Sequence, residues 1–297
     1  MTADTVRARP GAVRRLAIWF YRRPRMQLAA LLSSPLAWLG LAYLGSLAIL
    51  LLNAFWRNDP FTGRVEHTFT LDSFVTLFTV DVYRTIALRT IGVAAAVTLT
   101  DAVLAFPIAY YMARVASVRT RRFMVIAVLM PLWASYLVKI YAWRVILQGN
   151  GLLDWVLEPI DLHGPGVNQV ANSWLVLSYL WLPYMILPIY AALERLPGSL
   201  LEASADLGAR AGTTFRRVVL PAILPAVAAG SIFTFSLSMG DYITPDFVSD
   251  TKFIGNVIYD NSSLGSLPLA AAYSFLPIVV IVGYLLAARR LGAFESL

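Results

Sequence analysis

The chain has 297 residues, of which 59% are hydrophobic and 14% charged, and its mean hydropathy is +0.68. Soluble domains rarely exceed half apolar residues, so this composition excludes an ordinary soluble globular protein and favours a membrane protein. The chain has no cysteine, which excludes disulfides, thiolate catalysis and cysteine-based metal sites. Its net charge of +7 calls for no nucleic-acid partner, because the cations gather in a few segments that membrane topology explains.

Residues 1–34 form a basic segment with seven arginines. Residues 12–28 also carry Leu16, Ile18 and three aromatic residues, so they fit either a short helix lying in the membrane interface or part of a disordered basic tail. For residues 1–10 we expect the tail. The apolar run that follows reaches spanning length without a small-residue cleavage site, which predicts a retained span rather than a removed signal peptide.

Six apolar stretches have the roughly 20 residues that a spanning helix needs. They predict an all-α, polytopic membrane protein with one transmembrane domain over 35–290 and a short tail over 291–297. Prolines interrupt several of these stretches, which neighbouring helices in a bundle tolerate. The predicted spans are 35–55, 85–113, 123–146, 172–193, 218–239 and 268–288.

The distribution of cations predicts the orientation of these spans. One side of the membrane receives 17 of the 24 Lys and Arg residues, so we expect both termini to be cytoplasmic. These 17 are the seven arginines before the first span, Arg114, Arg119, Arg121, Arg122, Arg195, Arg210, Arg216, Arg217, Arg289 and Arg290.

The segments on the opposite side are acidic. They are either ordinary solvated loops or a means of concentrating a cationic substrate near the membrane. The acids in or beside them are Asp59, Glu66, Asp72, Asp81, Asp154, Glu158, Asp161, Asp241, Asp246, Asp250 and Asp260.

The stretch 195–217, between the fourth and fifth spans, predicts two short helices with a bend between them. Ser199 with Glu202 three residues later has the pattern of a capping box, which starts a helix. Gly208 can close that helix in the left-handed conformation. Thr213 or Thr214 can cap a second helix that runs into the next span.

The sequence lacks the common motifs for nucleotide binding, metal binding and nucleophilic catalysis. The two lysines, Lys139 and Lys252, end no phosphate-binding G-x-x-x-x-G-K-[ST] loop, and His67 and His163 have no partner at metal-ligand spacing. No G-x-S-x-G nucleophile motif occurs. We therefore predict no catalytic residue, no metal site and no nucleotide site in this chain.

A few polar and aromatic residues lie within the predicted spans. Asp101 falls near the middle of the second span, where an ionisable group has either a functional or a structural, helix-bridging role. Trp133, Tyr136, Tyr141 and Trp143 follow one another in the third span. They fit an interfacial aromatic belt, and they also fit a set of aromatic faces that hold an organic cation.

The stretch 202–221 resembles the cytoplasmic loop of bacterial ABC-importer permeases. That family has Glu-Ala-Ala, then Gly after three residues, then Ile-x-Leu-Pro after nine. Here Glu202-Ala203-Ser204, Gly208 and Val218-Val-Leu-Pro221 keep these spacings, with Ser204 and Val218 as small departures. The resemblance implies a type I (MetI-like) ABC importer permease with six transmembrane helices.

Three further passages resemble the spermidine/putrescine permeases in particular. They are 131–143, from Pro131 to Trp143, 193–202, which leads into the loop, and 238–245 followed by 254–258. Two features depart from that pattern, since Ala226 follows Pro225 where the family often has Gly, and Asp101 matches no family motif. Relatives with this architecture carry other solutes, such as iron, sulfate and phosphonate, so these remain the alternatives for the cargo.

The resemblance implies a transport subunit without enzymatic activity in the bacterial inner membrane, with lipid around it. Its implied partners are two ABC ATPases, which bind the ATP and Mg²⁺, a second permease and an extracytoplasmic binding protein. The ATPase-coupling residues that it implies are Leu200, Leu201, Glu202, Ala203, Ser204, Asp206, Leu207, Gly208 and Pro221.

The helix over 199–207 is predicted to expose Leu200, Leu201, Ala203, Ser204 and Leu207 to a groove on an ATPase. For the substrate pathway we expect Asp101, Trp133, Tyr136, Tyr141, Asp241 and Tyr242. Two rival interpretations are a stand-alone secondary transporter or channel, which would work without an ATPase, and an intramembrane enzyme, which would need a buried polar cluster.

Overall fold

The computed structural model describes residues 24–59, 64–149, 151–160 and 169–290. The chain separates into two compact units, 1–53 and 54–297, and each is described by itself. The tails 1–10 and 291–297 lie outside the described residues, and so does most of the interfacial helix considered for 12–28.

The first unit is one helical rod. It consists of α2 (Pro24–Trp38), a π-helical stretch η1 (Leu39–Leu44) and α3 (Gly45–Leu52). Its leucines are mostly exposed, and η1 and α3 contain no buried residue. A uniformly apolar, exposed helix suits a lipid environment, and the run Gln27–Phe55 is long enough to cross a membrane.

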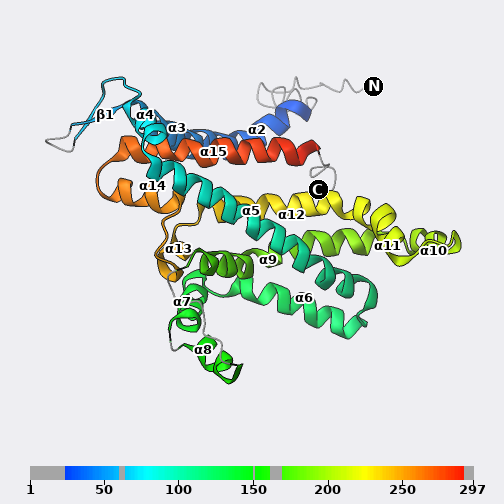
Figure 1. The fold of residues 1–297 in the computed structure, drawn as a ribbon. Helices are drawn as coiled ribbons and strands as arrows, with labels where there is room; N and C mark the ends of the chain where they lie inside the picture. The colour runs from blue at the N-terminus through cyan, green and yellow to red at the C-terminus, as the bar shows by residue number, and fades with distance from the viewer. Residues whose placement is uncertain (1–23, 60–63, 150, 161–168, 291–297) are drawn as a thin grey trace, which may run out of the picture. The chain divides into compact units, whose positions relative to one another are not determined.

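The second unit is a bundle of helices with a minimal two-stranded ribbon (Figure 1). The ribbon pairs β1 (Arg57–Asn58) antiparallel with β2 (Val65–Glu66). The longest helices are α5 (Asp81–Tyr110), α9 (Val170–Arg195), α12 (Leu220–Gly240) and α15 (Leu267–Arg290). The other elements are η2 (Asn53–Phe55), α4 (Asp72–Thr79), η3 (Tyr111–Val115), α6 (Val118–Trp133), α7 (Tyr136–Leu147), α8 (Leu152–Leu157), η4 (Glu158–Ile160), α10 (Gly198–Asp206), α11 (Ala211–Thr214), η5 (Phe215–Val219), α13 (Ile243–Val248) and α14 (Ile254–Ser263).

The bundle core lies where α5, α9 and α12 pack against one another. One buried cluster joins Ala105 and Ala109 of α5 to Ile186 and Ile189 of α9 and Ile223 of α12. A second cluster joins the beginning of α5 and the end of α12 to α14 and α15. The van der Waals contacts among these buried side chains hold α5, α9 and α12 together. The three helices have little amphipathic pattern of their own.

Close packing of α9 on α12 depends on a glycine. A Cβ added to Gly230 would lie 2.9 Å from the sulfur of Met185 and 3.1 Å from its Cα. Small residues at a helix interface let two backbones approach closely in a membrane. Gly230 therefore sets the distance between the two central helices.

The predicted third span, 123–146, is wrong as one continuous helix. The structure breaks it into α6 and α7, which are bent by 95° at Ala134 and Ser135. Pro131 lies just before the break, and the ammonium of Lys139 donates a hydrogen bond of 3.1 Å to its carbonyl oxygen. This bond satisfies one of the carbonyl groups left free at the end of α6.

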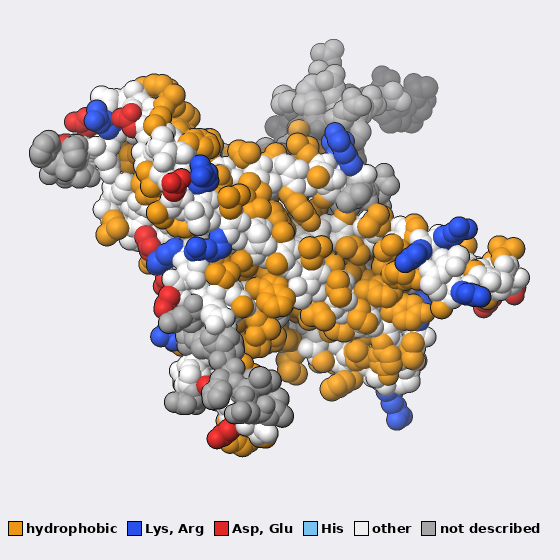
Figure 2. Space-filling model, viewed as in Figure 1, with side chains coloured by type: hydrophobic (Ala, Val, Ile, Leu, Met, Phe, Trp, Pro, Cys, Tyr) orange, Lys and Arg blue, Asp and Glu red, His pale blue; other side chains and the backbone are white. Residues whose placement is uncertain are grey.

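The other five predicted spans each lie within an observed helical run, although two of these runs begin earlier than predicted, at Gln27 and at Ala211. The structure has five helical runs long and apolar enough to cross a membrane, and six when the bent pair counts as one span. Within the unit 54–297, Figure 2 shows apolar side chains over the middle of the helices and arginines gathered over α10 and α11. The fold is an all-α membrane bundle.

Candidate functional site

The hairpin of α10 and α11 lies at one end of the second unit (Figure 1). We call residues 195–217 the hairpin. The helix α10 ends at Asp206, and Gly208 follows with φ +73°, a conformation that favours glycine. The amide of Gly208 donates to Ala205 O at 2.8 Å and that of Ala209 to Ser204 O at 3.0 Å. These two bonds form a Schellman motif, so the predicted closing role of Gly208 is confirmed.

The structure contains the two predicted short helices, but the predicted side-chain caps are wrong. The residue before α10 is Pro197 and no side chain caps the helix, so Ser199 and Glu202 do not form a capping box. Arg210 precedes α11, which also lacks a side-chain cap. Thr214 instead shares a 2.8 Å hydrogen bond with Ser204, which ties the two helices of the hairpin together.

The structure corrects part of the predicted exposed face of α10. Ser204 is buried against Thr214, and Leu201 is half-buried against the core cluster that also receives Phe215. Leu207 is 87% exposed and Leu200 is 47% exposed, as predicted. The remaining coupling residues predicted from sequence are also exposed, namely Glu202, Ala203, Asp206, Gly208 and Pro221. The hairpin thus presents an apolar tip, the contacts of Leu201 hold it against the bundle, and the bond of Ser204 joins its two helices.

The segment 241–266, between α12 and α15, contains two of the predicted pathway residues. The buried carboxylate of Asp241 accepts hydrogen bonds from the amides of Ile243 and Thr244, both at 3.0 Å, and from the Thr244 hydroxyl at 2.8 Å. The hydroxyl of Tyr136, on α7, donates to the same carboxylate. Asp241 therefore fixes the start of α13 and links it to α7, with its oxygens fully used.

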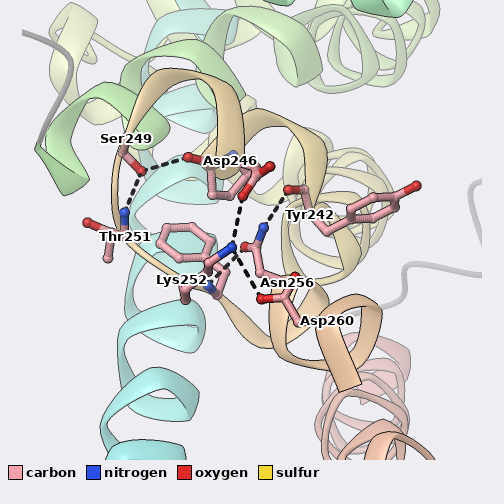
Figure 3. Close-up of polar contacts among 9 residues, drawn as sticks. Tyr242, Asp246, Ser249, Thr251, Lys252, Asn256 and Asp260 are labelled. Carbon is pink, nitrogen blue, oxygen red and sulfur yellow. Dashed lines mark hydrogen bonds and ion pairs between the residues drawn. The ribbon is translucent and has the colours of Figure 1, made fainter. Parts of the chain in front are cut away.

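Lys252 connects α13 to α14 in the same segment (Figure 3). Its ammonium lies 3.0 Å from an oxygen of Asp246 and 3.2 Å from one of Asp260. The hydrogen bond with Asp246 is the main cause that raises the pKa of Lys252 above its usual value. Asn256 donates a further bond of 2.7 Å to the backbone oxygen of Tyr242.

Beside these contacts Tyr242 stacks on Tyr259, with ring centroids 4.8 Å apart and planes 15° apart. Both rings are partly exposed. Sequence reasoning missed Tyr259, because nothing in the spacing of residues 242 and 259 indicates that α14 returns to the end of α12. Only the chain reversal through α13 brings the two rings together.

The other predicted pathway residues lie apart from this group. Asp101 is fully buried on α5, and neither carboxylate oxygen has a hydrogen-bond partner among the described residues. Trp133 is 90% exposed at the end of α6, and Tyr141 is half-exposed with its ring edge against Phe247. Among the described residues, no hydrogen bond or ring contact joins these three to Tyr136, Asp241 or Tyr242.

Comparison with known proteins places this geometry in a family. Residues 102–294 match the family model of the binding-protein-dependent transport system inner membrane component. The chain is 46% identical to the inner membrane ABC transporter permease protein YdcU of Escherichia coli K12, over 98% of this chain and 97% of that protein. It is 29% identical to the spermidine/putrescine transport system permease protein PotB of the same organism, over 84% and 91%.

Solved structures share the fold. A bacterial alginate ABC transporter, in complex with an alginate-bound periplasmic protein, has a chain that matches with a TM-score of 0.75 at 20% identity, covering 95% of this chain and 98% of that one. A chain of the MetNI methionine transporter matches with a TM-score of 0.54 at 15% identity, covering 72% and 95%. Because the family model matches more than half of the chain, the chain belongs to the inner membrane components of binding-protein-dependent transport systems and is a multi-pass ABC importer permease subunit.

Proposed function

We propose that this permease subunit imports polyamines together with a second, non-identical permease, two ABC ATPases and an external solute-binding protein. The ATP and Mg²⁺ are bound by the ATPases. Both termini and the hairpin face the cytoplasm, as the positions of the arginines favour. The permease supplies half of the translocation pathway and receives its energy through the hairpin.

The exposed tip of the hairpin is the main support for the proposed contact with the ATPase. Leu207, the residue that follows α10, is 87% exposed, and arginines gather over α10 and α11 (Figure 2). An apolar side chain exposed to water gains free energy when a partner covers it. Beneath this tip, Leu201 and Phe215 pack on the bundle core, and Ser204 bonds to Thr214. An apolar helix face on a rigid base fits a groove on another protein.

The connections of the hairpin support a mechanical role. On one side only Leu196 and Pro197 separate α9 from α10. On the other side, the helical run Ala211–Gly240 continues from α11 through η5 into α12 without a break. A displacement of α10 by a closing ATPase pair would therefore move α9 and α12, the two central helices, and rock the bundle between inward-open and outward-open states.

For the cargo, the proposal depends on the relatives and on the segment 241–266. PotB is named as a spermidine/putrescine permease, and the chain aligns with it over most of its length. The stacked rings of Tyr242 and Tyr259 belong to the same segment as Asp246 and Asp260, whose carboxylates pair with Lys252. Aromatic faces near carboxylates suit an organic ammonium. We place Tyr242, with Asp101, Trp133, Tyr136, Tyr141 and Asp241, along the route of the cargo.

An uptake screen tests the cargo. The purified four-component transporter in proteoliposomes should import radiolabelled putrescine or spermidine when ATP is enclosed with the ATPases, and should import ferric iron, sulfate and phosphonate at background rates. Uptake of one of those three solutes, with no uptake of either amine, would reject the polyamine assignment and leave the permease assignment intact.

A substitution at the tip tests the ATPase contact. Leu207→Asp places a charge where we expect an apolar groove, so the ATPase should no longer copurify with the permease. Leu264→Asp is the matched control, because Leu264 is also highly exposed, at 84%, but lies just after α14, far along the chain from the hairpin. Equal copurification from both variants would show that the hairpin tip does not bind the ATPase.

A further inference from the structure

Two arginines hold the point where α9 passes into the hairpin. The helix α9 ends at Arg195, and α10 begins three residues later at Gly198. The last carbonyl groups of a helix have no partner within it. Whatever binds those carbonyls determines the direction in which α10 leaves the bundle.

Arg114 binds two carbonyl groups at this point, one in the last turn of α9 and one just after it. Its guanidinium donates to the backbone oxygen of Leu193 at 2.6 Å and also to that of Leu196. Arg114 belongs to the π-helical stretch η3 that ends the α5 run, so these bonds join segments about 80 residues apart in the chain. A positive charge at the carboxyl end of a helix is also favoured by the helix dipole.

Arg121 fastens the other side of the same corner. From α6, its Nε donates to Met112 O at 3.0 Å and its Nη2 donates to Ala113 O at 3.3 Å. Its Nη1 lies 3.5 Å from the carboxylate of Glu194 on α9. One planar guanidinium therefore connects α6, η3 and α9, a geometry that a lysine ammonium does not reproduce.

The two arginines are half-buried and bind carbonyl groups of buried core residues. Met112 and Ala113, whose carbonyls Arg121 binds, are buried, and so are Leu193 and Leu196, whose carbonyls Arg114 binds. All four belong to the cluster on which Leu201 of α10 packs. Arg119 and Arg122 are exposed nearby, and the described residues show no hydrogen bond or ion pair for either. Charge on this turn alone does not explain the contacts of Arg114 and Arg121.

We propose that Arg114 and Arg121 are positioning residues that make α10 move as one body with α5, α6 and α9. When the clamp is intact, a displacement of α10 is carried into three spans. When it is broken, α10 pivots at Leu196 and Pro197, and less of the movement of a closing ATPase reaches α5, α6 and α9. This inference depends on the proposed contact between α10 and the ATPase.

The test compares Arg114→Met and Arg121→Met with Arg119→Met and Arg122→Met, which remove the same charge from the same turn. The complete transporter is reconstituted in proteoliposomes, and the ATP hydrolysed per solute imported is measured with the solute that the uptake screen selects. We expect the ratio to rise about fivefold or more in the first pair and to stay at the parental value in the second. For Arg114→Lys we expect a ratio between the parental value and that of Arg114→Met, because lysine keeps the positive charge but not the planar set of guanidinium donors.

A second readout is independent of the cargo. Since the parent has no cysteine, Val118→Cys and Arg210→Cys can carry a pair of spin labels across the corner. We expect the distance distribution between them to broaden in Arg114→Met and Arg121→Met and to stay narrow in the two controls.

Parental ratios together with narrow distributions in both clamp variants would overturn the inference. If Arg114→Met does not assemble, Arg121→Met decides alone, because it leaves the bonds of Arg114 in place. Failure of the clamp is distinguished from failure of the proposed function by Leu207→Asp. If Leu207→Asp retains its ATPase and full uptake, the proposed contact between the hairpin and the ATPase is wrong. If Leu207→Asp loses both while the clamp variants keep parental values, only the inference about Arg114 and Arg121 is wrong.

Discussion

Two buried aspartates in the bundle have opposite surroundings. Asp241 accepts hydrogen bonds from two amides and two hydroxyls, whereas Asp101 has no partner for either oxygen among the described residues. An unpaired buried carboxylate costs free energy, and a fully bonded one stabilises the segments that it joins. The two residues therefore allow opposite predictions about stability.

Removing the Tyr136 hydroxyl should destabilise the join between α7 and α13. Tyr136→Phe loses the bonds to Asp241 and Thr244, and losing a bond to a charged group costs about 1–3 kcal/mol. We expect the melting temperature of the purified chain in detergent to fall by about 2–6 °C. Tyr141→Phe is the control, because the Tyr141 hydroxyl has no hydrogen bond among the described residues. Equal melting of both variants would contradict this account of Asp241.

Replacing Asp101 by an apolar residue should have the reverse effect on stability. Asp101→Leu removes a buried carboxyl group that has no hydrogen-bond partner among the described residues and keeps a similar volume, so we expect the melting temperature to rise by about 2–4 °C. The control is Asp250→Leu, which alters an exposed carboxylate and should change little. A fall in the melting temperature of Asp101→Leu would mean that a partner for the carboxyl group exists.

For single residues, the sequence was a reliable guide where the backbone conformation requires a particular residue type. Gly208 was predictable, because a left-handed residue that ends a helix is usually glycine. The capping roles of Ser199, Thr213 and Thr214 were not, because the start of α10 is determined by Pro197 and the tight link to α9. Ser204 turned inward to meet Thr214, and that contact depends on the angle between two helices, which no local pattern encodes.

At the scale of elements, Lys252 holds α13 and α14 together outside the membrane-spanning helices. Its pKa is raised, chiefly by the hydrogen bond with Asp246. Stabilisation by a group with a raised pKa is complete below the unfolded value, about 10.4 for lysine, and is lost as the pH rises through the folded value. The contact should therefore be constant from neutral pH to about pH 9 and weaken only at strongly alkaline pH.

A spin label at Thr251→Cys can measure this effect. We expect low mobility at pH 7 and pH 9 in the parent background, greater mobility once the pH is well above the reference lysine pKa of about 10.4, and high mobility at every pH with Lys252→Met. Arg289→Met is a control, since it removes a cation from the end of α15. If the label has equal mobility with and without Lys252, the ion pairs do not restrain the segment.

The apolar runs made most elements predictable, because lipid requires about 20 apolar residues per span whatever the packing. The break between α6 and α7 was not predictable from Pro131 alone, since Pro107, Pro183, Pro188 and Pro225 all lie inside continuous helices. What differs at 134–135 is the capping of freed carbonyls by Lys139 and the packing of α7 on α13. The first contact forms only after the chain has bent, and the second joins segments far apart in the sequence, so local sequence patterns predict neither.

For the whole molecule, the orientation of the bent pair decides the number of spans. If α6 and α7 together cross the membrane, Gln148 after α7 faces the outside, whereas Arg119 at the start of α6 faces the cytoplasm. In intact spheroplasts an impermeant maleimide should label Gln148→Cys, and it should label Arg119→Cys only after the membrane is opened. Labelling of both positions from the same side would make α6 and α7 a re-entrant pair.

The proposed engine of the transporter is an ABC ATPase that drives amine import by pushing on the hairpin. The most direct measurement follows radiolabelled putrescine uptake and ATP hydrolysis in the same proteoliposomes, with the complete transporter and either the parental chain or Leu207→Asp. We expect uptake that requires ATP and the binding protein, and background uptake with Leu207→Asp at unchanged permease content. Uptake without ATP, or parental uptake by Leu207→Asp, would contradict the account.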